Sequence, residues 1–128
     1  MLVSKWHPDF KVGVSPVDNE HKQLRLIMGR VLQAMDGGAK EDLAKNLDLL
    51  AKAAARHFSH EERLLRLTDF PATRPHEREH AKFLSKVHEM KTGSLTVEAA
   101  RSLCDGYEQH IKHSDKEFSG YLNVRGIR

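Results

Sequence analysis

Two pairs of metal-binding side chains, each pair spaced four residues apart, lie within residues 57–80. His57 and Glu61 form one pair, and His76 and His80 form the other. On a helix, residues four apart lie on the same face, one turn above each other. If the two segments form neighbouring helices, two imidazoles of one helix face an imidazole and a carboxylate of the other. This spacing predicts a metal site between two helices.

The same apolar faces carry further residues that can bind a metal. Together they number five histidines and two carboxylates: His21, His57, Glu61, His76, His80, His110 and Asp115. A carboxylate buried alone would protonate or turn outward, because desolvation strongly disfavours its charged form. Two buried carboxylates among five imidazoles are explained if cations lie between them. Imidazole and carboxylate ligands suit Fe, Mn or Zn and argue against a thiolate site.

This set of ligands is too large for one metal ion. If both carboxylates bridge two six-coordinate metals, and a hydroxide or oxide also bridges them, the set fills all but one coordination position. The remaining position is open to a small ligand. The residue types therefore predict a two-metal site that binds a small molecule.

Four helices are needed to position these residues, and the spacing of apolar residues predicts them. Apolar residues recur at alternating steps of three and four, which is the pattern of one helix face. The first expected helix begins at residue 15 and is stopped by residues 36–38, and the second covers residues 40–67. The third begins at residue 73 and ends at a turn at 92–94, and the fourth runs from about residue 94 or 96 to 122. Ser15 and Thr73 are expected to cap the first and third helices, since Pro16 and Pro75 are tolerated only in a first turn.

The fourth helix requires an irregularity. His110 and Asp115 are five residues apart, which on a regular helix turns the second residue about 140° past a full turn. The two side chains would then point in different directions. A π-bulge near residues 110–115 would realign them, and such bulges recur at functional sites.

Four amphipathic helices with short connections predict an all-α fold, an antiparallel up-down-up-down four-helix bundle. We expect one domain over residues 1–128, with an N-terminal arm at 1–14 and the bundle at about 15–122. Trp6, Phe10, Val12 and Val14 of the arm are expected to pack over one end of the bundle.

The composition excludes several functional classes. The net charge is only +3, and Lys and Arg are scattered among Asp and Glu, which argues against nucleic-acid binding. No apolar run approaches the roughly 20 residues of a membrane helix, and no stretch has the pattern of a secretory signal. Cys104 is the only cysteine, so an intrachain disulfide is impossible, and we expect it to be a buried small residue. We therefore expect a cytoplasmic protein.

The order of these motifs resembles that of the bacterial hemerythrins. The resemblance spans residues 6–118, and all seven ligand positions are filled. It includes Trp6, Phe10, Val12-Gly13, Asp18 and His21, then His57-Phe58, Glu61-Glu62 and Phe70-Pro71, then His76, His80, His110-Ile111 and Asp115.

The resemblance implies a non-haem di-iron centre that binds O2 reversibly. It implies two irons joined by an oxo or hydroxo bridge and by Glu61 and Asp115. By the family pattern, three histidines hold one iron, and two hold the other, which keeps the open position. These sets are His76, His80 and His110 for the first iron, and His21 and His57 for the second.

Tyr107 departs from the family pattern. It lies one turn before His110 on the same face, where the family commonly has an aliphatic residue that shields O2. Its ring can supply the same apolar cover. Its hydroxyl adds a hydrogen-bond donor that would slow O2 release, or a route for protons and water that would speed autoxidation.

The remaining histidines are expected at the surface: His7, His60, His88 and His113. Glu62 either faces solvent or orients a histidine ligand.

Oxygen carriage, storage or delivery is the leading function, without enzymatic activity and with O2 as the ligand of the centre. An O2-consuming partner would be of unknown identity. Two alternatives remain open at this point. One is a di-iron enzyme that reduces peroxide or nitric oxide, and the other is sensing of O2, redox state or iron, or iron handling.

Overall fold

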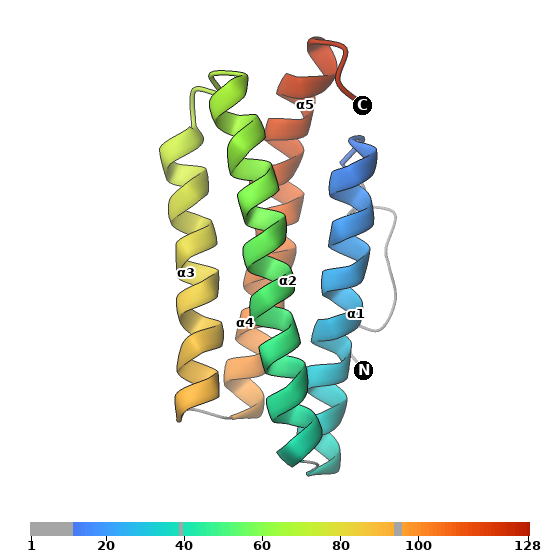
Figure 1. The fold of residues 1–128 in the computed structure, drawn as a ribbon, viewed down its shortest axis with the longest axis vertical. Coiled ribbons are helices and arrows are strands. Elements are labelled where there is room, and N and C mark those ends of the chain that lie inside the picture. The colour runs from blue at the N-terminus through green and yellow to red at the C-terminus, as the bar shows by residue number, and fades with distance from the viewer. Residues whose placement is uncertain (1–11, 39, 94–95) are drawn as a thin grey trace.

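The computed structural model describes residues 12–38, 40–93 and 96–128, and within them it contains helices and no strands. The elements in order are α1 (Ser15–Gly37), α2 (Lys40–Leu67), α3 (Thr73–Thr92), α4 (Val97–His110), the π-helical segment η2 (Ile111–Asp115) and α5 (Lys116–Val124). Figure 1 shows α1, α2 and α3 as rods that lie side by side and run in alternating directions, with α4, η2 and α5 continuous as the fourth rod. The predicted all-α four-helix bundle is confirmed.

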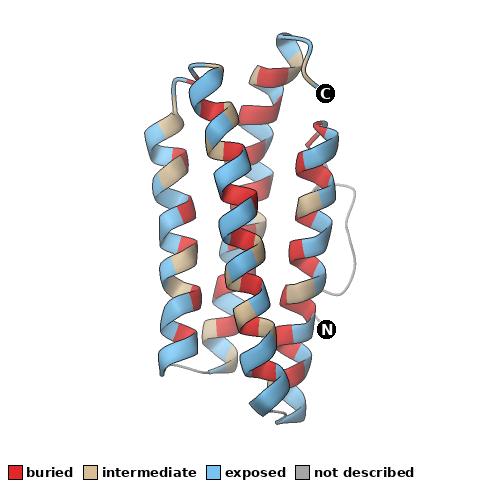
Figure 2. Ribbon diagram, in the orientation of Figure 1, coloured by how far each residue is buried: buried red, intermediate tan, exposed pale blue. Residues whose placement is uncertain are grey.

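Each helix buries one stripe of side chains along the bundle axis, as Figure 2 shows. In α1 the buried residues include Leu24, Met28 and Val31, and in α2 they include Leu47, Leu50 and Ala54. Side chains three and four apart share a helix face, so these stripes meet in one core. The metal-binding residues of the sequence lie in the same stripes.

The helix starts differ in part from prediction. Thr96 caps α4, since its side chain accepts a hydrogen bond from the Ala99 amide at 3.0 Å. Ser15 and Thr73 do not cap: they are the first residues of α1 and α3, and the N-cap positions Val14 and Ala72 form no side-chain cap. The hydroxyl of Thr73 instead donates to the Phe70 carbonyl at 2.6 Å, which stabilises the preceding turn.

Asp18 explains the start of α1. Its carboxylate accepts hydrogen bonds from the backbone amides of Val12 at 2.7 Å and Gly13 at 3.2 Å. Gly13 has a positive φ of 95°, a conformation that glycine adopts readily. The chain thus turns into α1 around Asp18. Val12 and Val14 are buried as expected, whereas Trp6, Phe10 and His7 lie outside the described residues.

The predicted π-bulge is confirmed. Residues Ile111–Asp115 form a π-helical segment between α4 and α5. The extra residue per turn brings His110 and Asp115 to the same side of the helix, and both are buried. Beyond the bulge, Phe118 and Leu122 continue the core stripe of α5.

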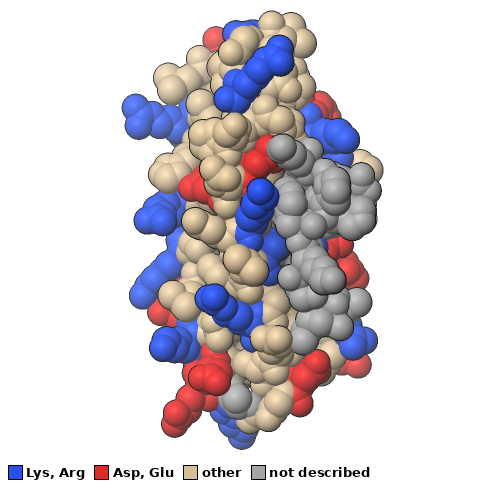
Figure 3. All heavy atoms as spheres, turned by 90° about the vertical axis from the view of Figure 1, so that its right-hand side faces the viewer, with Lys and Arg blue, Asp and Glu red and all other residues tan. Residues whose placement is uncertain are grey.

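The surface shows no concentration of a single charge on the face seen in Figure 3, where basic and acidic side chains alternate. Within the described parts of the chain, every helix is too short or too polar to cross a bilayer. Cys104 is buried as expected, and burial raises the pKa of its thiol to about 12, so it is an unreactive core residue.

Candidate metal centre

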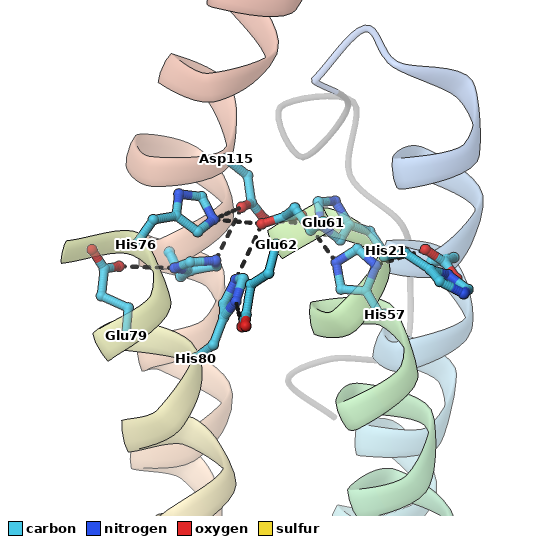
Figure 4. Close-up of polar contacts among 11 residues, drawn as sticks. His21, His57, Glu61, Glu62, His76, Glu79, His80 and Asp115 are labelled. Carbon is cyan, nitrogen blue, oxygen red and sulfur yellow. Dashed lines mark hydrogen bonds and ion pairs between the residues drawn. The ribbon is translucent and has the colours of Figure 1, made fainter. Parts of the chain in front are cut away.

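The seven residues singled out in the sequence converge between the four helical rods. Figure 4 shows those that it labels pointing toward one region between the helices. Each is at most 8% exposed. The set comprises His21 from α1, His57 and Glu61 from α2, His76 and His80 from α3, His110 from the end of α4 and Asp115 from η2.

Glu61 presents its two oxygens to opposite sides of this region. Its Oε1 faces His76 Nε2 in a short contact and lies 3.1 Å from His80 Nε2. Its Oε2 lies 3.2 Å from His57 Nε2. One carboxylate therefore contacts imidazoles from α3 on one side and from α2 on the other.

Asp115 is placed in the same way. Its Oδ1 lies 3.0 Å from Nε2 of both His76 and His110, and its Oδ2 lies 2.9 Å from His21 Nε2. The two carboxylates thus separate the donors into two groups. The first group contains Glu61, His76, His80, His110 and Asp115, and the second contains His21, His57, Glu61 and Asp115.

These contacts have the spacing of ligands that share a metal. In each group, one donor atom per residue lies within 4.8 Å of all the others. For metal–ligand bonds of about 2.1 Å, adjacent ligands at right angles are about 3 Å apart. Several of these atoms make no hydrogen bond despite their proximity, among them His21 Nε2, His57 Nε2 and His110 Nε2, and both oxygens of Asp115. The nitrogen and oxygen donors of each group suit a cation that prefers such ligands.

The electrostatics of the centre favour positive charge. Burial lowers the pKa of His57, but the hydrogen bond to Glu20 and the nearby Glu61 carboxylate outweigh it and raise the pKa to about 9. In the same way, Asp115 and Glu61 overcome burial and raise the pKa of His76 to about 9 and that of His110 to about 10.

The two carboxylates respond in the opposite sense. Burial and the Asp115 charge act to raise the pKa of Glu61, yet the imidazoles of His57, His76 and His80 that face its oxygens lower it overall. Burial opposes ionisation of Asp115 as well, but His110, His21 and His76 hold its pKa well below the usual range. Both carboxylates are therefore anionic, and the imidazoles around them compensate their charge.

A second layer of carboxylates fixes three of the histidines. Glu20 Oε1 lies 2.9 Å from His57 Nδ1, Glu62 Oε2 lies 2.8 Å from His80 Nδ1, and Glu79 Oε1 lies 2.8 Å from His110 Nδ1. A carboxylate on Nδ1 selects the tautomer that leaves Nε2 free for a metal. This arrangement is the usual way a protein orients a histidine ligand.

Sequence reasoning identified Glu62 as a possible partner but missed Glu20 and Glu79. The available signal was the Glu-His doublet, since Glu20 precedes His21 and Glu79 precedes His80. One residue corresponds to about 100° around a helix, so a glutamate beside one inward residue can reach the next helix. Here Glu20 of α1 reaches α2, Glu62 of α2 reaches α3, and Glu79 of α3 reaches α4.

Three of the four histidines expected at the surface are among the described residues, and all three are at the surface. His60, His88 and His113 are exposed. His60 also contacts the outer layer, because its Nδ1 lies 3.0 Å from Glu20 Oε2.

Aromatic side chains of α2 and α4 pack against the histidines of the centre. Phe58 stacks on His80 with ring centroids 3.9 Å apart. Tyr107 is 1% exposed, and its ring centroid lies 6.0 Å from that of His21 and 6.2 Å from that of His110. Its hydroxyl has no hydrogen-bond partner among the described residues. Burial, reinforced by Asp115 and Glu61, raises the pKa of Tyr107 well above its ordinary value, so the hydroxyl keeps its proton.

Comparison with known proteins gives consistent matches along most of the chain. The family described as the hemerythrin HHE cation binding domain matches residues 12–122. Myohemerythrin of Sipunculus nudus is 31% identical over 119 residues, covering 91% of this chain and 92% of that protein. Bacteriohemerythrin of Pseudomonas aeruginosa strain LESB58 is 26% identical over 124 residues, covering 93% and 79%.

A solved structure supports the fold independently. A hemerythrin with a leucine-to-tyrosine substitution superposes with a TM-score of 0.87 at 22% identity, covering 95% of this chain and 98% of that one.

Proposed function

Because the chain belongs to the hemerythrin family, we propose that it binds O2 reversibly at a non-haem di-iron centre. The proposal combines the family with the arrangement of donors inside the bundle. Relatives from both animals and bacteria are named hemerythrins. Binding of O2, without catalytic turnover, is the function that this centre supports best.

The observation that carries the proposal is the division of the donors into groups of unequal size. We assign three histidines, His76, His80 and His110, to one iron, because they contact one face of the bridging carboxylates. His21 and His57 are assigned to the other iron, on the opposite face. The side with His21 and His57 would therefore offer its iron one fewer protein ligand than the other side, and this side would leave room for O2.

Iron held at this centre would supply the electrons for reversible O2 binding. The chain supplies the surroundings that keep the process reversible. In this assignment every imidazole and carboxylate of the centre is a ligand, so none remains as a general base for turnover. Phe58 and Tyr107 cover the centre with aromatic rings, which excludes water and slows loss of electrons to solvent.

Tyr107 lines the O2 pocket in this proposal. Its ring lies against His21, a ligand of the side with the open position. Its hydroxyl is buried and has no hydrogen-bond partner among the described residues. A buried, unsatisfied hydroxyl is a donor available to a polar ligand, so Tyr107 is expected to affect how long O2 stays bound.

Two measurements test the proposal. Elemental analysis of protein produced in iron-replete medium should find roughly two irons per chain, as the two donor groups require. Reduced protein mixed with O2 in a stopped-flow spectrometer should develop an optical band that is stable and disappears under vacuum. Rapid oxidation without such a band would instead favour redox chemistry or sensing, and one metal per chain would contradict the di-iron assignment.

A further inference from the structure

A pocket of about 170 Å³ opens to the surface between α3 and α4, outside the metal centre. Its floor consists of aromatic rings from three helices, namely Phe58, Phe83 and Tyr107. Phe83 and Tyr107 contact each other with ring centroids 5.1 Å apart. A pocket of this kind offers flat apolar surface on which a ring can stack.

Gly106 keeps the pocket open. It lies in the interior of α4 and lines the pocket, and a Cβ added there would meet nothing within 4 Å. Glycine in a helix interior costs about 0.5–1 kcal/mol relative to alanine. Neither backbone conformation nor close packing requires glycine at this position, whereas a larger side chain would project into the pocket.

The rim of the pocket is positively charged. Lys82 and Lys86 both line it, and residues four apart share one face of α3. Neither lysine forms an ion pair within the described part of the chain. The acidic residue of the pocket, Glu79, is already engaged, since it accepts hydrogen bonds from His110 and Ser114. The charges available to an incoming molecule are therefore the two ammonium groups.

We propose that this pocket binds a small aromatic carboxylate with a single ring. The volume suits one ring, because an apolar cavity of about 150 Å³ accommodates benzene. The ring would stack on the aromatic floor, and the carboxylate would pair with Lys82 and Lys86 at the rim. Charge-assisted hydrogen bonds from an ammonium to a carboxylate are stronger than neutral ones.

This binding site is separate from the proposed O2 position but adjoins the metal centre. Its inner wall includes His80 and His110, which belong to the group of five donors. The open position proposed above lies on the other side, with His21 and His57. An occupant of the pocket would exclude water from the outer faces of two histidines, which would let it modify the centre without occupying it.

Isothermal titration calorimetry with benzoate tests the proposal on the purified protein with its native metal content. Benzoate should bind, whereas benzyl alcohol, which has the ring without the charge, and acetate, which has the charge without the ring, should bind at least several-fold more weakly. Equal affinity for benzyl alcohol would show that the rim lysines play no part and would overturn the proposal. So would an absence of benzoate binding.

Variants locate the bound benzoate. Gly106→Leu should weaken benzoate binding about tenfold or more, which corresponds to roughly 1.4 kcal/mol, whereas Gly120→Leu should not. Gly120 is a matched control, since it is a helical glycine of α5 whose added Cβ also meets nothing within 4 Å. Combined substitution Lys82→Gln and Lys86→Gln should weaken binding several-fold, and Lys45→Gln, on exposed surface of α2, should leave it unchanged.

Competition with azide separates this site from the metals. Benzoate bound at a metal would be displaced by azide and would be insensitive to Gly106→Leu, and that result would overturn the proposal. Benzoate in the pocket should persist in the presence of azide. None of these measurements depends on O2 binding, so the inference and the proposed function can fail independently.

Discussion

The two sides of the candidate metal centre differ in how many histidines they provide. The side formed with α3 and the end of α4 offers three histidines in addition to the shared carboxylates, and the side formed with α1 and α2 offers two. On the first side, His80 and His110 are each held by an outer glutamate. On the second, His57 is held by Glu20. On each side one histidine, His76 or His21, has an Nδ1 without a hydrogen-bond partner in the described part of the chain.

The difference follows from what each helix contributes. Helix α3 places two inward histidines one turn apart, whereas α1 places only His21 at this level. The carboxylates lie between the sides and belong to both. In the proposed assignment, the side with fewer histidines would leave room for a diatomic molecule, and the side with more histidines would hold its metal through more protein ligands.

Metal removal tests what the two sides share, and it should have the largest effect. The metal-free protein is expected to unfold at a clearly lower temperature, because a metal present at 1,000 times its Kd stabilises the fold by about 4 kcal/mol. Thermal unfolding followed by circular dichroism, before and after chelation, measures this. Equal melting temperatures would mean that the seven residues are not a buried metal site.

Raising the pH should increase the difference in stability between the metal-bound and metal-free forms. In the metal-free protein the pKa values of His57, His76 and His110 are raised to about 9, 9 and 10. Their stabilisation is complete below the unfolded value of 6.5 and is lost as the pH rises through these values. Metal binding requires neutral imidazole, so the metal's contribution grows over the same range. The difference in melting temperature should therefore widen between pH 6.5 and about 10.

Substitution of a shared carboxylate should affect both sides at once. Glu61→Ala removes one oxygen from each group of donors and should lose at least one metal per chain. Glu62→Ala is the matched neighbour: the Glu62 carboxylate lies 2.8 Å from His80 Nδ1, outside both groups of donors, and this variant should retain both metals. Elemental analysis measures the metal content of the two variants. Retention of both metals by Glu61→Ala would refute the bridging role.

Single histidine substitutions should separate the two sides. His21→Ala leaves three donor side chains in its group, and His110→Ala leaves four. Metal should therefore be lost from His21→Ala at chelator concentrations at which His110→Ala still holds both ions. Chelator titration of each variant gives the order of loss, and the reverse order would contradict the proposed asymmetry.

The outer glutamates should have a smaller effect on each side. Glu20→Gln and Glu79→Gln keep the side-chain shape but remove the charge that orients His57 and His110. Loss of such a partner typically lowers metal affinity 10–100-fold, which competition with a coloured chelator would measure. Glu41→Gln, on exposed surface of α2, serves as the control and should leave the affinity unchanged.

Tyr107→Phe should have the smallest effect, and only on the bound ligand. The ring that contacts both His21 and His110 remains, so iron content should not change. Loss of one hydrogen bond, worth roughly 1 kcal/mol, should alter the lifetime of the oxygenated form several-fold in stopped-flow measurements. An unchanged lifetime would make Tyr107 a packing residue.

Local periodicity was sufficient to predict the helices, the inward residues and the bulge. Residues three and four apart share a helix face whatever the helix packs against, so the positions of His57 and Glu61, or of His76 and His80, could be read directly. The spacing of His110 and Asp115 conflicted with a regular helix, and only a π-helical segment reconciled them. Ser15 and Thr73 were wrong as caps because a cap depends on how the preceding chain enters the helix. That entry is set here by contacts of Asp18 and Phe70.

The sequence by itself determined which seven side chains point inward, because helical periodicity is a local property of the chain. Only the tertiary structure decided which oxygen of Glu61 and Asp115 faces which histidine, and which glutamate of one helix reaches a histidine of the next. It also decided that Gly106 borders an open pocket and that the Tyr107 hydroxyl is buried without a partner. These features depend on the rotation and separation of neighbouring helices, which arise from packing of the whole core.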